Sequence, residues 1–225
     1  KFAVSPYQTG SASKLITDII NRLKINKFLL DKKSKHRIVR PAFKRFNELK
    51  VKDIKFDFHM HTNQTDGKNT AQEMIAQAKK LKLNSMAFTE HVNYSTNWFH
   101  NFKKRIEGLR KNEKMEILIG IEVKPVDFGG TLDCAQDILE TAEIIVGSVH
   151  RYPDGKNGLI PLNDIKELGE NKSMEIEFNL AMGLLKNEDN QIDVLGHPFG
   201  VYLRFFDSFK EKYFEELFIE SLKRG

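Results

Sequence analysis

The chain has 225 residues, 40% of them hydrophobic and 30% charged, which is typical of a globular protein with one sizeable domain plus an extension, or with two small domains. No apolar run approaches the ~20 residues that a membrane-spanning helix needs, and the first residues lack the apolar stretch of a signal peptide. The single cysteine, Cys134, excludes an internal disulfide and fits a reducing compartment. We therefore expect a cytoplasmic protein that has no membrane partner.

Charge is distributed unevenly along the chain. Residues 1–55 carry a balance of +11 and the remainder a balance of −6, which together give the net charge of +5. The pattern of residues 1–53 predicts a helix capped near Ser11, a basic connector, and a second short helix that begins at Pro41. We therefore predict a basic helical N-terminal extension over residues 1–53. Its charge indicates either an acidic partner such as nucleic acid or simply a solvated surface.

From residue 54 onward, segments of strand and helix periodicity alternate. The expected strands are Phe56–His61, Ser85–His91, Ile117–Val123, Ile144–His150 and Ile192–His197. The expected helices are one that opens at the capping box Thr70–Glu73, one through Phe102 and Leu109, Leu132–Thr141 with Cys134 packed on it, Glu167–Leu185, and one through Phe214 and Leu222. Such alternation predicts an α/β domain with a parallel sheet, either doubly wound or closed into a barrel.

Each predicted strand ends in a side chain of a metal-ligating type. These strand ends are His61, His91, Glu122, His150 and His197. In a parallel barrel the C-terminal ends of all strands meet at one mouth, whereas the outermost ends of an open sheet lie too far apart to share a site. The pattern therefore favours a closed or nearly closed barrel.

The polar residues of the first strand extend this set. His59 and His61 alternate with apolar residues, so both point to one face, and Asp66 lies in a turn just past the strand tip. Imidazole and carboxylate ligands together favour zinc, manganese or iron over calcium or a structural zinc site. About seven ligands exceed the needs of one tetrahedral ion, which favours two or three divalent ions that share Glu122 as a bridge. The alternative is a group of independent core histidines.

These residues fall into motifs that resemble a known family. The motifs are His59-x-His61 with Asp66-Gly67, Thr89-Glu90-His91, Gly120-Ile121-Glu122, Gly147-Ser148-Val149-His150 and Gly196-His197-Pro198. In order and spacing they resemble the PHP (polymerase and histidinol phosphatase) family over residues 54–205. The resemblance implies a distorted seven-stranded (β/α) barrel with a trinuclear metal site in residues 54–225. It also implies hydrolysis of phosphate esters such as histidinol phosphate, although other members are nucleases or domains attached to bacterial DNA polymerases.

The resemblance also assigns the ligands to three ions. The first ion takes His59, His61 and Glu122, the second takes Glu122, His150 and His197, and the third takes Asp66 and His91. A late Asp-x-His motif, which completes the first and third sites in the family, does not occur in these 225 residues. A truncated chain that lacks the last barrel strands is the explanation that we favour. A partner segment that completes the barrel, or a member with fewer metals, is the alternative.

A hydrolytic mechanism follows from this ligand set as a hypothesis. A metal-bound hydroxide attacks phosphorus, and Glu122 and His150 hold the metals. Arg151 directly follows His150 and is placed to bind the phosphate in a bidentate manner, although it is equally well a surface residue. The weaker candidates for substrate contacts are Arg204, Lys124, Tyr152, and the pair Trp98 and His100 in the predicted loop after the second strand. His36 has no assigned role.

Three functions are compatible with the sequence. The first is metal-dependent hydrolysis of a small phosphate monoester, with histidinol phosphate as one family example. The second is a nuclease or phosphodiesterase that grips nucleic acid with the basic extension. The third is a degenerate barrel that serves as an interaction module.

Overall fold

The computed structural model describes residues 54–156, 158–208 and 210–224, so the predictions for residues 1–53, including the two helices and His36, lie outside the described residues. The strands are β1 (Phe56–Met60), β2 (Ser85–His91), β3 (Glu116–Val123), β4 (Ile145–Ser148) and β5 (Val194–Gly196). The helices are α2 (Ala71–Lys80), α3 (Phe99–Arg110), α4 (Gln136–Thr141), α5 (Glu170–Lys186) and α6 (Glu211–Arg224), with short 3₁₀ turns η5 (Leu162–Ile165) and η6 (Tyr202–Arg204).

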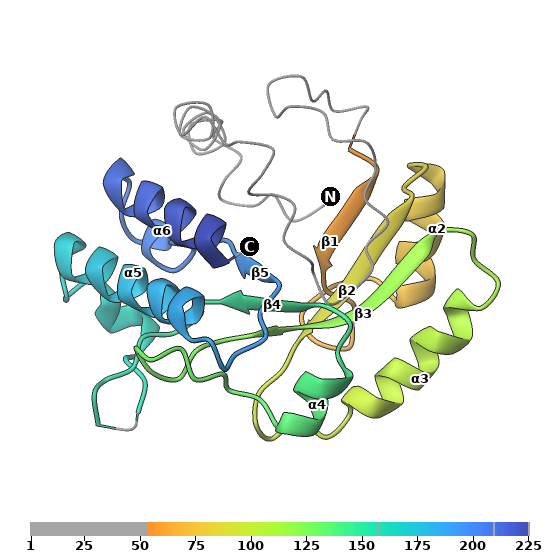
Figure 1. Ribbon diagram of the computed structural model, residues 1–225, viewed down its shortest axis with the longest axis horizontal. Coiled ribbons are helices and arrows are strands. Elements are labelled where there is room, and N and C mark those ends of the chain that lie inside the picture. The colour runs from red at the N-terminus through yellow and green to blue at the C-terminus, as the bar shows by residue number, and fades with distance from the viewer. Residues whose placement is uncertain (1–53, 157, 209, 225) are drawn as a thin grey trace.

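The five strands form one parallel sheet in chain order, β1-β2-β3-β4-β5. Figure 1 shows that this sheet curls, with α2 and α3 outside one end and α5 and α6 outside the other. A doubly wound sheet reverses its strand order part-way across, whereas a barrel keeps it. The structure is therefore an α/β half-barrel, which confirms the predicted class and decides between its two possible architectures.

The central strands are covered on both faces. The adjacent residues Ala87 and Phe88 of β2 are fully buried. In β3, Ile121 is fully buried and Glu122 is only 1% exposed. Because successive strand side chains point to opposite faces, one member of each pair packs under the helices and the other faces the inside of the curl. Glu122 is thus a buried carboxylate on β3, between apolar neighbours.

Side-chain contacts fix the ends of two helices. The predicted capping box is present at the start of α2, where the Glu73 carboxylate accepts from the Thr70 N–H at 2.8 Å. At the end of α3, Arg110 forms a two-pronged ion pair with Glu143, with N–O distances of 2.7 and 2.8 Å. Glu143 also accepts from the Ile119 N–H at 2.9 Å, so the pair ties α3 to the sheet.

Several predicted boundaries are wrong by a few residues. β4 and β5 end before their histidines, so His150 and His197 lie in the loops just past the strands. The helix predicted from Leu132 begins at Gln136, because Leu132 instead forms an antiparallel bridge with Pro125. Cys134 therefore precedes α4 instead of lying on it. It is nevertheless buried, and burial raises the pKa of its thiol to about 11, which agrees with a packing role.

Membrane insertion finds no support in the described part of the chain. None of the helices within residues 54–224 combines the length and the apolar character needed to cross a bilayer.

Candidate metal centre

Glu122 lies at the centre of a group of five histidines. Its Oε1 atom is 3.1 Å from His59 Nε2, 3.1 Å from His150 Nε2 and 2.8 Å from His197 Nε2. Its Oε2 atom is 3.1 Å from His61 Nε2 and 3.2 Å from His91 Nδ1. The five predicted strand ends and His59 therefore do converge, although they come from segments up to 138 residues apart in the sequence.

Sheet register explains part of this convergence. His91 at the end of β2 is paired directly with Glu122 of β3 in the parallel ladder. Between β1 and β2 the register shifts after Asp57, and the Thr89 hydroxyl accepts from the Met60 N–H at 3.1 Å where the ladder is interrupted. Such an irregularity bends a strand and re-aims its side chains, here next to His59 and His61.

A tight loop after β1 places Asp66 against the same cluster. Its Oδ2 atom lies 3.3 Å from His91 Nε2. The loop is held from beneath by Glu90, a fully buried carboxylate that accepts from the Thr62 N–H at 2.8 Å and from the Thr65 hydroxyl. Gly67 closes the turn, because a Cβ at that position would lie 2.0 Å from the His61 carbonyl oxygen.

A second buried carboxylate holds the loops after β4 and β5. Glu177 of α5 accepts from the Tyr152 hydroxyl at 2.7 Å and from the backbone N–H groups of Val201 and Tyr202 at 3.1 and 2.7 Å. Burial raises the pKa of Glu177 to about 7 despite these donors. The three donors lie two to five residues past His150 and His197, so Glu177 fixes the segments that carry both histidines.

The charges within the cluster are strongly coupled. Burial alone raises the pKa of Glu122, but the close imidazoles of His150, His197, His59 and His61 outweigh burial and hold that pKa far below its usual range. The same imidazoles therefore favour the ionised carboxylate of Glu122. Burial lowers the pKa of His91, which favours the neutral imidazole that metals require.

The donor set fits divalent metal ions. Three groups bring one ligand atom from each member to within 4.8 Å of one another: His59, His61 and Glu122; His61, Asp66 and His91; and His91, Glu122 and His150. Two buried atoms in these groups, His61 Nδ1 and Glu122 Oε2, have no hydrogen-bond partner of good geometry. Buried polar atoms without such partners are expected where ligand atoms face a cation. The cluster could therefore bind metal, while the assignment of each ligand to an ion stays a prediction.

Comparison with known proteins agrees with this geometry. A family model described as the PHP domain matches residues 57–223. The chain belongs to the PHP domain family.

Three relatives are similar to this chain over part of their length. The chain is 30% identical to the DNA polymerase/3'-5' exonuclease PolX of Bacillus subtilis over 110 residues, which are 45% of this chain and 19% of PolX. It is 26% identical to the uncharacterized protein MJ1295 of Methanocaldococcus jannaschii over 182 residues, which are 76% of this chain and 69% of that protein. It is 27% identical to the probable phosphatase NT01CX_1282 of Clostridium novyi over 151 residues, which are 63% of this chain and 52% of that protein. The chain thus spans about a fifth of PolX and about half of the probable phosphatase.

A pocket of about 230 Å³ adjoins the histidine cluster of this PHP domain. Its lining residues are His91, Val92, Asn93, Lys124, His150 and Arg151. The structure therefore places two of the predicted substrate contacts, Arg151 and Lys124, beside two predicted ligands. Arg204 lies exposed on η6 and does not line this pocket. Tyr152 is fully buried with its hydroxyl bound to Glu177, so the structure does not support it as a substrate contact.

Trp98 lies in the segment after β2, as predicted, but His100 does not, and neither residue is among the residues that line this pocket. His100 is the second residue of α3, and its Nε2 atom pairs with Asp137 of α4 at 2.7 Å. Trp98 packs edge-on against Phe102, with 5.9 Å between ring centroids. His100 thus links α3 to α4, whereas Trp98 packs against the first turn of α3.

Sequence reasoning missed the structural roles of Glu90 and Glu177. Glu90 belongs to the Thr89-Glu90-His91 motif, in which only His91 was given a role. Its position in an otherwise apolar strand indicates a buried side chain that accepts internal hydrogen bonds. Glu177 likewise interrupts the apolar residues Met174 and Leu180 on the buried side of α5. A carboxylate among residues that face the core is expected to have internal hydrogen-bond donors, which is the signal that could have found both.

Proposed function

We propose that this PHP domain is a metal-dependent phosphoesterase that hydrolyses a phosphate monoester of a small molecule, in the manner of a histidinol phosphatase. The observation that carries the proposal is the convergence of five histidines on Glu122, with Asp66 at the rim of the group. Membership of the PHP family and the similarity to a probable phosphatase support the same reaction class.

Two or three ions of zinc, manganese or iron are proposed to bind here. His59, His61 and Glu122 would hold the first ion, Glu122, His150 and His197 the second, and Asp66 and His91 the third. Ions in such a site activate water near neutral pH and neutralise charge on the phosphoryl oxygens. Glu122 would supply negative charge to both of the first two sites, because the imidazoles around it lower its pKa. Glu90 and Glu177 keep the surrounding loops in place.

Arg151 is proposed to orient the phosphate. It follows His150 directly and lines the pocket beside it, so its guanidinium is within reach of a group bound between the pocket and the cluster. A planar guanidinium can donate two parallel hydrogen bonds to one phosphate. Arg204 is proposed as a weaker contact from the exposed turn η6. The pocket volume suits a phosphate-sized group, which favours a small substrate.

The half-barrel is proposed to be part of a seven-stranded PHP-type barrel. Its parallel strands follow chain order, as a barrel requires. Its two edge strands each leave an apolar side chain exposed, Phe56 at 47% on β1 and Val194 at 37% on β5. Further strands would cover such edges.

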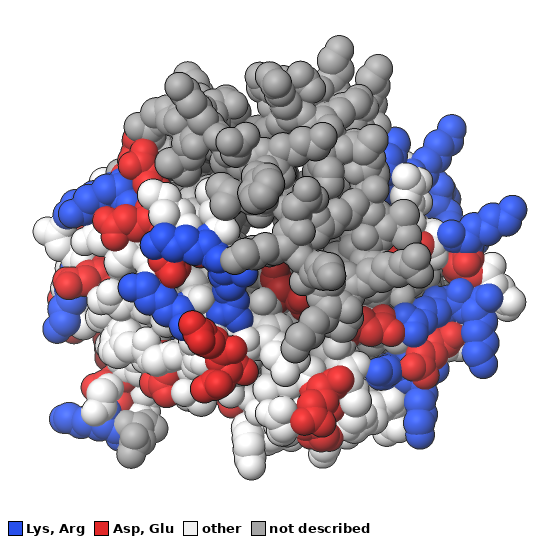
Figure 2. All heavy atoms as spheres, viewed as in Figure 1, with Lys and Arg blue, Asp and Glu red and all other residues white. Residues whose placement is uncertain are grey.

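A nuclease is the second candidate, because PolX carries a 3'-5' exonuclease in its name and its similar segment is 30% identical. On the face seen in Figure 2, Lys and Arg side chains of the described residues are interspersed with Asp and Glu, and neither sign gathers into one patch. An electrostatic track for a nucleic-acid backbone would need such a patch. The described part of this one face therefore offers no support for a nucleic-acid track. The third candidate, a degenerate interaction module, requires a cluster that holds no metal.

A substrate panel separates the three candidates. Purified protein loaded with Mn²⁺ or Zn²⁺ is assayed against small phosphate monoesters, including histidinol phosphate, and against single-stranded DNA and RNA. We expect release of inorganic phosphate from at least one monoester and dependence on metal. Cleavage of nucleic acid alone, with an affinity that falls steeply as salt rises, would establish the nuclease instead. Metal analysis that finds no bound ion would support the interaction module.

A further inference from the structure

A lysine–carboxylate pair flanks the pocket beside the histidine cluster. Lys124 lines the pocket, and its Nζ atom is in close contact with Asp133 Oδ2. The two side chains are 20% and 18% exposed, so the pair is only partly solvated. Lys124 is the first residue past the end of β3 and follows Glu122 by two residues.

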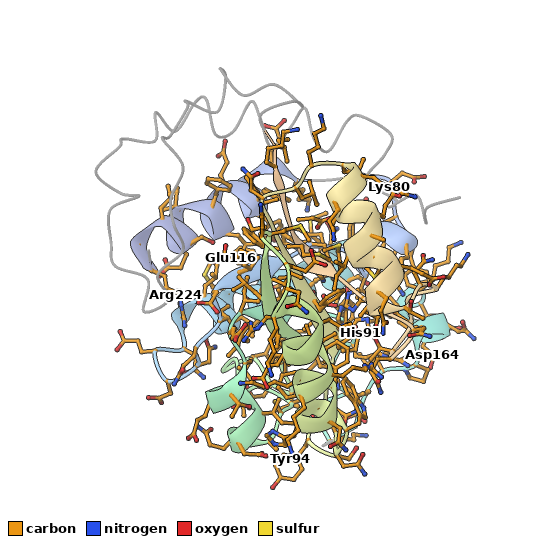
Figure 3. All side chains as sticks on the ribbon, turned by 90° about the vertical axis from the view of Figure 1, so that its right-hand side faces the viewer. Lys80, His91, Tyr94, Glu116, Asp164 and Arg224 are labelled. Atoms are coloured by element: carbon orange, nitrogen blue, oxygen red, sulfur yellow. The ribbon has the colours of Figure 1, made fainter. Side chains whose placement is uncertain are left out.

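The backbone holds this pair in a fixed arrangement. Residues 124–133 double back on themselves, with Pro125 and Leu132 bridged antiparallel and the Asp133 N–H donating to the Lys124 carbonyl at 2.9 Å. The second carboxylate oxygen of Asp133 accepts from the Tyr94 N–H at 3.0 Å. Asp133 therefore has one oxygen fixed by the loop after β2 and the other directed at Lys124. Figure 3 labels Tyr94 at the lower edge of the view.

Positive side chains outnumber negative ones among the described residues that line the pocket. Lys124 and Arg151 contribute two cations to its lining and Asn93 adds an amide, and none of the described residues that line it is a carboxylate. Asp133 compensates one of the two cations from the side. A phosphate that enters the pocket meets Arg151 directly but must compete with Asp133 for Lys124.

We propose that Lys124 is a substrate-binding residue that donates to a phosphate oxygen in this pocket, and that Asp133 restrains Lys124 and weakens phosphate binding. The inference rests on the proposed phosphoesterase function and adds a specificity-determining pair to it. Asp133 acts only through Lys124, since its other oxygen is occupied by the backbone of the neighbouring loop. The two residues should therefore have opposite effects on phosphate affinity when each is replaced.

The test measures binding of inorganic phosphate to the metal-loaded protein by calorimetry, alongside KM and kcat for the best monoester. Lys124→Met should weaken phosphate binding about tenfold and raise KM, because a charge-assisted hydrogen bond is lost. Asp133→Asn should tighten phosphate binding roughly threefold, because the amide still accepts from Tyr94 while Lys124 is released. The double variant should match Lys124→Met alone.

A second lysine–carboxylate pair provides the control. Lys79 of α2 is bound to Glu113, with Nζ 2.9 Å from Oε2, and both residues lie towards the N-terminal ends of the strands. Lys79→Met and Glu113→Gln should leave phosphate affinity unchanged. Looser or unchanged binding in Asp133→Asn, or unchanged binding in Lys124→Met, would overturn the inference. Wild-type protein that binds no metal and hydrolyses no ester would overturn the proposed function itself, so the two failures are distinguishable.

Discussion

Replacement of Glu122 by glutamine tests the metal centre most directly. The substitution keeps the shape of the side chain but removes a negative charge that five imidazole nitrogens approach within 2.8–3.2 Å. Because the surrounding imidazoles lower the Glu122 pKa, the ionised carboxylate is favoured in the wild type, and glutamine removes that charge. Two of the three ligand groups contain Glu122, whereas the group of His61, Asp66 and His91 does not.

These groupings set the size of the expected effect. The variant should lose the ions of two groups and retain at most the one near Asp66. Metal ions supply several kcal/mol of transition-state charge stabilisation, and each 1.36 kcal/mol corresponds to a factor of ten in rate. Turnover should therefore fall by roughly a thousandfold or more.

The assay combines metal content, measured by mass spectrometry of the purified protein, with turnover of a small phosphate monoester. Glu143→Gln is the matched control, since it alters a partly buried carboxylate at the opposite end of the strands. It should leave both quantities near the wild-type level. Full metal content and near-normal turnover in Glu122→Gln would show that Glu122 is not a shared ligand.

Three further predictions follow from buried contacts. Glu143→Gln should lower the free energy of unfolding by about 1–2 kcal/mol at pH 7, measured by urea denaturation. Burial raises the pKa of Glu143, but Arg110 and the Ile119 N–H outweigh burial, so the folded pKa lies below the unfolded value near 4.5. The stabilisation is therefore present above pH 4.5 and disappears as pH falls through the folded pKa. The difference between variant and wild type should therefore shrink below pH 4.5, and a constant difference would contradict the ion pair. Gly67→Ala should displace the Asp66 loop, cost about 1–3 kcal/mol and reduce metal content, because the new Cβ would lie 2.0 Å from the His61 carbonyl oxygen; a crystal structure with the loop unmoved would refute this. Glu177→Gln should cost about 1–3 kcal/mol of unfolding free energy, since one amide oxygen cannot accept from Tyr152, Val201 and Tyr202 together. The same variant should also bind metal more weakly at His150 and His197. Unaltered metal affinity would show that Glu177 has no influence on the loops that carry these histidines.

Local sequence determined the elements and the types of ligand. Period-two alternation located β1, short apolar segments located the other four strands, and Thr70 with Glu73 located the start of α2, because these signals arise from neighbouring residues. The same signals misplaced the start of α4 and put His100 in a loop. A contact across the turn, between Pro125 and Leu132, decided the first case. Helical structure from Phe99 onward, without a side-chain cap at Trp98, decided the second.

The tertiary structure alone decided which residues support the cluster. Histidines at strand ends are visible in sequence because a parallel sheet brings those ends to one edge. The same rule does not predict the roles of Glu90 and Glu177, whose hydrogen bonds reach residues 24–28 positions away along the chain. Nor does the rule predict the role of Asp133, which contacts Lys124 because the loop between them doubles back. Residue spacing fixes which face a side chain occupies within an element, whereas the partner of a buried charge depends on how separate elements pack together.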